Sequence, residues 1–196
     1  MLGMNAVIVQ AEEHPRPVED GGAIPTSPLQ FYVGEIDRYT ARDLNAKWHS
    51  RLPFYKTGFC LNAKVAYGLF YKNLVYGVAI WSNPVARNLP QKEYLELRRM
   101  ALSPQCPKNT ASRMLSVMTR LIKKKYPEIT RLVSYQDVEV HTGCIYRASG
   151  WRIGLVHRGG SWNRPNSKNL SNGKPRTRPD SNRATGPKVR WELTVR

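Results

Sequence analysis

The chain has 196 residues, 41% of them hydrophobic, and a formal net charge of +17. This length and apolar content suffice for one domain with a real core, and no apolar run reaches the ~18 residues of a membrane span, which argues against both a disordered chain and a membrane protein. A positive excess this large favours a polyanionic partner, above all nucleic acid, because binding releases the counterions of the polyanion.

The N-terminal segment lacks a basic stretch followed by a long apolar run, so we expect a soluble, unexported, cytoplasmic protein. Residues 1–29 are rich in proline and glycine and are predicted to form an irregular lead-in, with the domain starting at residue 30. Phe31–Ile36 is then predicted as a short strand. Thr40 is the expected N-cap of a helix that runs from Ala41 to about His49.

The middle of the chain predicts a hairpin and a third strand. Two runs rich in β-formers, Lys64–Tyr71 and Val75–Trp81, are separated by a Lys-Asn pair that suits a tight turn. Tyr94–Leu102 follows as a strand with Leu95 and Leu97 facing the core. Strict alternation would send Arg98 and Arg99 of this strand to opposite faces, so that only one of them could point to a cleft while the other would reach solvent or an acidic partner.

The strongest helix comes next, capped by Asn109 or Thr110 and ended by three lysines before Pro127. Its apolar residues recur at helical spacing and are Met114, Leu115, Met118, Leu121 and Ile122. We then predict a strand at Thr130–Tyr135, a short helix at His141–Ser149 and a strand at Trp151–His157.

The C-terminal part changes composition. Residues 158–188 are rich in Gly, Ser, Asn, Pro and basic side chains, and we predict that they form a nucleic-acid-binding arm; residues 189–196 alternate apolar and polar positions and should return to the sheet as a last strand. The three cysteines, Cys60, Cys106 and Cys144, form no CxxC pair, and we interpret them as small buried side chains rather than as disulfide or zinc ligands.

The order of these elements resembles the GNAT acyltransferase fold. The strand Tyr94–Leu102 matches the central strand of that family, and Gly143–Trp151 matches its closing segment, where a tyrosine precedes a Gly-aromatic pair. The resemblance implies an α/β domain over residues 30–157, with a mixed central sheet flanked by helices, to which the basic arm and the final strand are added. It departs from the family in the loop Pro107–Arg113, which lacks the glycines that usually hold a pyrophosphate.

A closer resemblance, over residues 30–170, is to the phage Mom family. Its most specific parts are Asn109–Arg113, Ser134–Asp137 and the helix with the tyrosine. This resemblance implies a transferase that converts adenine in phage DNA to its N6-carbamoylmethyl form in the host cytoplasm and thereby protects the DNA from restriction. Two alternatives stay open, namely a GNAT N-acetyltransferase that acts on protein or RNA, and a non-catalytic DNA-binding protein on a GNAT scaffold.

The chemistry of adenine selects candidate catalytic residues, because its N6 amine is a poor nucleophile that needs a base or a strong acceptor. Asp137, at a strand end, could accept the N6 proton, although it could equally cap the next helix. Ser112, in the first turn of the long helix, could hold a carbonyl group or act only as a cap. The resemblance to GNAT enzymes, many of which use this tyrosine as a general acid, makes Tyr146 the candidate proton donor, with Tyr135 nearby, although Tyr146 could also be a half-buried core residue.

Arg99 is the preferred arginine of its pair, and His49 is a candidate base or metal ligand that could also be a surface histidine. The metal is unknown. Asn109, Thr110, Ala111 and Arg113 are expected to bind the donor, because a helix N-terminus attracts anions. The donor is open between acetyl-CoA and a glycyl donor such as charged tRNA, with an iron ion as a further candidate.

Double-stranded DNA is the expected partner. Basic side chains would neutralise phosphates and an aromatic ring would stack on a base. The candidate DNA-binding residues are Arg158, Trp162, Arg164, Lys168, Arg176, Arg178 and Arg183.

Overall fold

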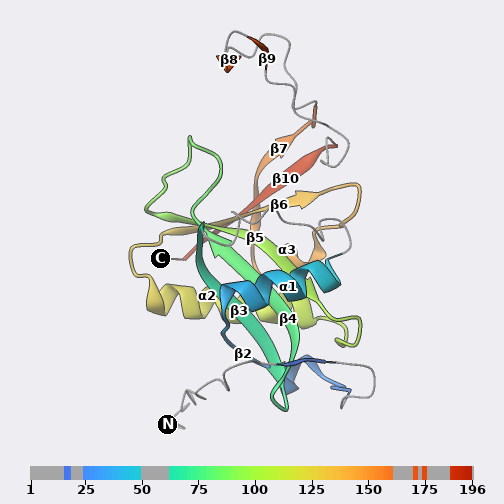
Figure 1. Ribbon diagram of the computed structural model, residues 1–196. Helices are drawn as coiled ribbons and strands as arrows, with labels where there is room; N and C mark the ends of the chain where they lie inside the picture. Colours follow the sequence, from blue (N-terminus) through green and yellow to red (C-terminus); the bar gives the residue numbers. More distant parts are fainter. Residues whose placement is uncertain are drawn as a thin grey trace.

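The computed structural model describes residues 16–18, 24–49, 62–160, 170–171, 174–175 and 186–195. Its main feature is an eight-stranded mixed sheet in the order β2-β3-β4-β5-β6-β10-β7, with β1 paired to β4 (Figure 1). The strands of this sheet are β1 (Arg16–Pro17), β2 (Tyr32–Glu35), β3 (Ala63–Tyr71), β4 (Leu74–Ser82), β5 (Tyr94–Leu102), β6 (Arg131–Asp137), β7 (Arg152–His157) and β10 (Lys188–Thr194). The helices are η1 (Pro28–Gln30), α1 (Arg38–Trp48), α2 (Thr110–Lys125) and α3 (Cys144–Ala148).

The sheet changes direction between its two halves. Strands β2 to β5 form an antiparallel meander, whereas β5 and β6 are parallel and are joined through α2. Strand β10 then lies between β6 and β7, antiparallel to both. The α/β architecture with a mixed central sheet and a final strand is therefore as the sequence predicts.

Two cores cover the two faces of the hairpin β3–β4. Alternate side chains such as Ala66 and Ile80 pack against Ala41 and Leu44 of α1, which lies in front of the sheet in Figure 1. The intervening residues pack on the other side with the apolar side of α2, whose fully buried members are Met114, Leu115, Met118 and Ile122. Because both faces are buried, the two strands appear in the sequence as nearly continuous apolar runs.

The predicted hairpin is confirmed. Lys72 and Asn73 both adopt positive φ angles, 47° and 61°, as a two-residue turn between right-handedly twisted strands requires. The strand Tyr94–Leu102 also has the predicted bounds.

The predicted cap of the first helix is wrong. Asp37, not Thr40, is the N-cap, since its carboxylate accepts hydrogen bonds of 2.9 Å from the amides of both Tyr39 and Thr40. The helix therefore starts at Arg38, and the hydroxyl of Thr40 lies 3.3 Å from the same carboxylate oxygen.

The predicted bounds between Thr130 and Ser149 also shift. Strand β6 continues to Asp137 because β10 pairs with it along that whole length. Helix α3 begins only at Cys144, since the preceding Gly143 has the left-handed φ of 72°. Cys144 itself is exposed and Cys106 is half-buried, so the expectation of buried cysteines is wrong for Cys144.

The two segments at the ends of the domain contain short elements. Within the predicted lead-in, Arg16–Pro17 joins the sheet and Ser27 caps a 3-10 turn with Gln30. Within the predicted basic arm, Leu170–Ser171 and Lys174–Pro175 pair as β8 and β9. Among the described residues no helix is long and apolar enough to cross a membrane.

Candidate active site

Strands β5 and β6 part at the centre of the sheet. Their parallel pairing runs from Tyr94 opposite Arg131 to Leu97 opposite Ser134, after which β5 and β6 each continue for several residues. The register between β4 and β5 shifts at the same level, because Trp81 pairs with Leu97 while its neighbour Ile80 pairs with Arg99. Arg98 is therefore an extra residue, a β-bulge that re-aims the side chains around it.

A cavity of about 180 Å³ lies at this fork. It is lined by residues of both strands, of the start of α3 and of the end of α1. The structure thus brings four of the six predicted catalytic residues to one place, and these are His49, Arg99, Tyr135 and Tyr146.

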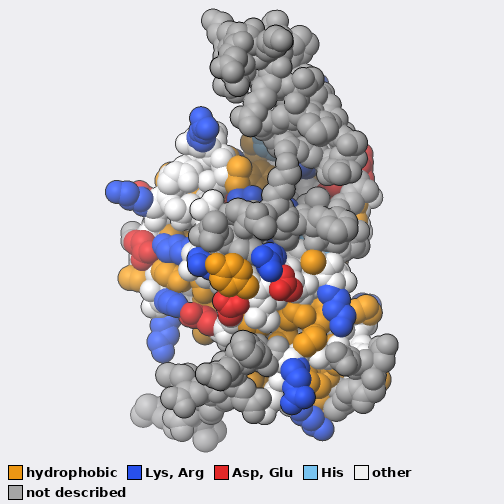
Figure 2. Space-filling model, viewed as in Figure 1, with side chains coloured by type: hydrophobic (Ala, Val, Ile, Leu, Met, Phe, Trp, Pro, Cys, Tyr) orange, Lys and Arg blue, Asp and Glu red, His pale blue; other side chains and the backbone are white. Residues whose placement is uncertain are grey.

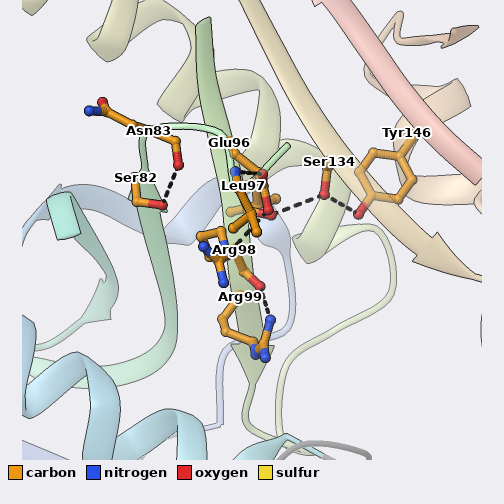
Figure 3. A network of polar contacts seen from close by, with 9 residues as sticks. Ser82, Asn83, Glu96, Leu97, Arg98, Arg99, Ser134 and Tyr146 are labelled. Carbon is orange, nitrogen blue, oxygen red and sulfur yellow. Dashed lines mark hydrogen bonds and ion pairs between the residues drawn. The ribbon is translucent and has the colours of Figure 1, made fainter. Parts of the chain in front are cut away.

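Tyr146 is held by aromatic packing and one hydrogen bond. Its ring stacks on Trp191 at 5.3 Å and meets Trp151 edge-on at 5.6 Å. Its hydroxyl is 2.9 Å from Ser134 Oγ, which in turn donates to the carbonyl of Leu97, so the phenol is the donor to the serine (Figure 3). Burial raises the pKa of Tyr146, so at neutral pH it is a protonated hydroxyl at the point where the strands separate.

His49 is the C-terminal cap of α1 and lines the same cavity. Burial, together with the positive charge of Arg99 and the proximity of His141, lowers the pKa of His49 to about 4. The imidazole is therefore neutral at physiological pH, and a neutral imidazole has one ring nitrogen that can accept a hydrogen bond.

Arg98 and Arg99 both line the cavity, so the prediction that only one of them points to it is wrong, whereas the predicted acidic partner of the other arginine is present as Glu96, 3.2 Å from Arg98 Nε. The bulge interrupts the two-residue period at this position. Arg99 also donates to the carbonyl of Arg98, at 2.5 Å (Figure 3).

Tyr135 occupies the next position on β6 after Ser134. Burial, followed by the nearby carboxylate of Glu96, raises the pKa of Tyr135, while a hydrogen bond with Arg190 opposes that shift. This tyrosine is therefore a neutral hydrogen-bonding group on the wall of the cavity.

Asp137 and Ser112 do not line the cavity. The carboxylate of Asp137 accepts a hydrogen bond of 3.1 Å from the amide of Glu139 and so closes the turn that follows β6. This contact is similar to the alternative prediction that Asp137 caps the backbone after the strand. Ser112 donates its hydroxyl to the carbonyl of Asn109 at 3.0 Å, and its own carbonyl accepts Ser149 Oγ at 2.9 Å. Their catalytic roles stay predictions.

The N-terminus of α2 contains the predicted donor-binding residues. Asn109 has a φ of 70°, the left-handed conformation that glycine would otherwise supply, and its side chain makes no cap hydrogen bond. Thr110 is buried and donates to the carbonyl of Pro107 at 2.6 Å, so its side chain has a structural role. Ala111 and Arg113 are half-buried in the first turn, and the amide of Arg113 already donates to the carbonyl of Asn109 at 3.1 Å.

Sequence reasoning missed several residues that shape the site. Ser134 anchors Tyr146, and Gln136 accepts Trp191 Nε1 at 2.7 Å and donates to the carbonyl of His141. A side chain on Gly143 would collide with Gln136 and Trp191. The signal was present in the polar strand end from Ser134 to Asp137, but which of these residues point inwards depends on pairing with β10.

The predicted DNA-binding residues fall mostly outside the described residues. Arg158 is exposed, just beyond the end of β7. On the face shown in Figure 2, Lys and Arg side chains are spread over the surface among fewer acidic ones. No group of three or more His, Cys, Asp or Glu side chains suited to a metal ion occurs in the part of the chain that the structure describes. The other six predicted DNA-binding residues, Trp162, Arg164, Lys168, Arg176, Arg178 and Arg183, are not described.

Comparison with known proteins identifies the family. The model of the Mom protein family matches residues 30–184. The chain belongs to the Mom protein family. Its relative, Methylcarbamoylase mom of Escherichia phage Mu, is 28% identical over 151 residues, which are 68% of this chain and 63% of that protein. The chain thus matches less than two thirds of the length of this Mom relative.

Solved structures show which fold this Mom protein has. The ribosomal-protein-S18-alanine N-acetyltransferase of Escherichia coli is similar with a TM-score of 0.55 and 11% identity, over 84% of this chain and 94% of that one. A GNAT-family acetyltransferase of Streptococcus pneumoniae gives 0.55 and 10%, over 85% and 99%. A Bacillus subtilis acetyltransferase in complex with CoA gives 0.54 and 13%, over 84% and 97%. The fold is therefore that of the GNAT acetyltransferases, as predicted.

Proposed function

We propose that this protein is a transferase that modifies the N6 amine of adenine in phage DNA, giving N6-carbamoylmethyladenine and protecting the DNA from host restriction. The observation that carries the proposal is the cavity at the fork of β5 and β6 in a member of the Mom family, lined by the neutral His49 and the proton donor Tyr146. The name of the phage Mu relative, a methylcarbamoylase, supports the reaction, and the net charge of +17 supports DNA as the substrate.

The cavity residues suit a weakly nucleophilic amine. A neutral His49 accepts a hydrogen bond from N6 and orients its lone pair, whereas a charged imidazolium would repel a developing positive charge on that nitrogen. Tyr146 would hydrogen-bond to the carbonyl oxygen of the incoming group, either directly or through the hydroxyl of Ser134. Arg99 adds a fixed positive charge for a developing oxyanion.

The same proposal includes a coenzyme A thioester, acetyl-CoA, as the source of the two-carbon unit. When bound, acetyl-CoA would supply the two carbons of the carbamoylmethyl group, whereas the amide nitrogen must come from a second, nitrogen-containing donor and the new bond to N6 must be made at the methyl carbon rather than at the acyl carbon. The residues at the start of α2 fit a pyrophosphate, because Asn109 takes the left-handed conformation without a glycine and its side chain does not cap the amides of Ala111 and Ser112. The amides of Thr110 and Arg113 already donate to the carbonyls of Pro107 and Asn109. Among the solved relatives, the Bacillus subtilis enzyme contains CoA.

The test is nucleoside digestion and mass spectrometry of plasmid DNA from cells that express the protein, grown on isotope-labelled acetate or glycine. The proposal predicts carbamoylmethylated adenine that carries the acetate label. Unmodified adenine from a folded protein that binds DNA would favour a non-catalytic DNA-binding protein, and acetylated protein or RNA would favour an ordinary N-acetyltransferase. Label that arrives intact from glycine alone would overturn the thioester donor.

A further inference from the structure

A second, larger cavity adjoins the candidate active site. It has a volume of about 780 Å³ and lies between the start of β3, the end of β4 and the loop that joins β4 to β5. Arg98, the bulged residue of β5, lines both cavities. The volume of this second cavity is within the usual range of ligand pockets, whereas the cavity at the candidate active site is smaller.

Basic side chains reach this second cavity from three elements. Lys64 comes from β3, Lys92 from the β4–β5 loop and Arg98 from the bulge. Lys64 Nζ is 2.8 Å from Glu128 Oε1 and 4.6 Å from the centroid of the Tyr126 ring. Lys64 pairs with Glu128 and Arg98 with Glu96, so the three cations and two carboxylates leave these side chains with a net charge of +1, centred on Lys92, which suits a single phosphate.

Glu96 holds the shared arginine in place. It is only 5% exposed, one carboxylate oxygen is 3.2 Å from Arg98 Nε, and the other accepts the amide of Val85 at 2.8 Å. These contacts, shown in part in Figure 3, tie the bulge to the β4–β5 loop. Glu96 is therefore a positioning residue that fixes the guanidinium between the two cavities.

We infer that the second cavity binds the phosphate and sugar of a nucleotide that flanks the target adenine, with Lys92, Lys64 and Arg98 around the phosphate. This inference rests on the proposed function. It follows from the shared Arg98, because a nucleotide strand with one base in the small cavity must place an adjacent phosphate beside it. The exposed amide side chains of Asn62 and Asn83 add uncharged hydrogen-bond donors to the same wall.

Duplex oligonucleotides test the inference when a neutral methylphosphonate replaces each phosphate around the target adenine in turn. Wild-type protein should lose affinity at one or two flanking positions. Replacing the exposed Lys92 in Lys92→Gln should abolish that positional sensitivity. It should also lower the log–log salt slope of binding by about 0.9, which is the contribution of one phosphate contact on duplex DNA. The matched control Lys123→Gln, an exposed lysine in the last turn of α2, should change neither.

A second variant, at Glu96, tests the same inference without changing Lys92. Glu96→Gln retains an acceptor for the Val85 amide but removes the charge opposite Arg98, so it should weaken the sensitivity at the same positions. Unchanged positional sensitivity in both variants would overturn the inference while leaving the proposed function intact. A wild-type protein that neither binds DNA nor modifies adenine would instead overturn the proposed function.

Discussion

Tyr146 carries its hydroxyl on a ring that is fixed between Trp191 and Trp151. Tyr146→Phe keeps both ring contacts and removes only the donor to Ser134, so the unfolding free energy should fall by about 1 kcal/mol. If the hydroxyl is a proton donor in the reaction, the modification rate should fall about a hundredfold or more. Single-turnover modification followed by mass spectrometry measures the rate, and thermal unfolding measures the stability.

Tyr67→Phe is the matched control. The Tyr67 hydroxyl is buried without a hydrogen-bond partner among the described residues, and burial raises the pKa of Tyr67. Its removal should leave the rate unchanged and should not lower stability, since an unsatisfied polar group is lost. Equal rates for Tyr146→Phe and the wild type would reduce Tyr146 to a packing residue.

His49 predicts a pH dependence of stability. Its pKa is about 4 in the folded protein and near the ordinary value of 6.5 in the unfolded chain. Between these values the unfolded state binds the proton and the folded state does not, so this contribution to stability is intact above pH 6.5 and is lost as the pH falls to about 4. Melting temperatures of the wild type should therefore drop more steeply across this interval than those of His49→Gln. Parallel curves would contradict a buried neutral imidazole.

At the scale of single elements, the start of α2 depends on one residue in an unfavourable backbone conformation. Asn109 holds a φ of 70° and makes no side-chain cap bond. Asn109→Ala should lower the unfolding free energy by about 1 kcal/mol, because alanine tolerates the left-handed conformation less well, whereas Asn109→Gly should not lower it. Chemical denaturation measures both. A glycine variant less stable than the alanine variant would show that the asparagine side chain, not the backbone conformation, matters here.

The elements that the sequence predicted well are those defined by local pattern. The hairpin β3–β4 follows from two β-rich runs and a two-residue turn, and α2 follows from apolar spacing with basic residues at its end. The start of α1 was missed because Asp37 and Thr40 are both good caps, and only the geometry shows that the aspartate accepts the two amides.

The candidate site was harder to predict, because its shape depends on non-local pairing. The bulge at Arg98 exists only relative to β4, and the length of β6 depends on β10, which follows some fifty residues later. Residue types alone therefore named Tyr146 and His49 but not their surroundings. The same limit explains why Ser134 and Gly143 were noticed only as parts of matching motifs and were not selected as site residues, since their contacts with Tyr146, Gln136 and Trp191 depend on the fold.

At the scale of the whole molecule, the candidate catalytic groups and much of the positive charge lie in different parts of the chain. The fork of β5 and β6 gathers the candidate catalytic groups, while much of the positive charge lies in the C-terminal part of the chain, where residues 158–190 contain nine Lys and Arg against one acid. Because β7 and β10 are neighbours in the sheet, the segment between them starts and ends at the same edge. A DNA-binding arm at this position would add affinity without altering the fork.

The arm gives the last prediction. Replacing Arg176, Arg178 and Arg183 together with Ala should weaken DNA binding evenly across sequences, because contacts to phosphates do not read bases. Each phosphate contact contributes about 0.9 to the log–log salt slope on duplex DNA, so the slope should flatten by roughly 2 to 3 units. Fluorescence anisotropy with labelled duplexes over a range of salt concentrations measures it. Activity should recover at low salt or high DNA concentration, since the fork is untouched.

The control for the arm is the basic end of α2. Lys123 and Lys124 are exposed there, and Lys125 pairs with Glu35 at 2.6 Å. If the arm carries the phosphate contacts, replacing Lys123 and Lys124 with Gln should leave the salt slope as it is. If the salt slope is unchanged in the arm variant but flatter in this control, the DNA phosphates contact the basic end of α2, on the side of the sheet opposite α1. The DNA would then bind away from the second cavity.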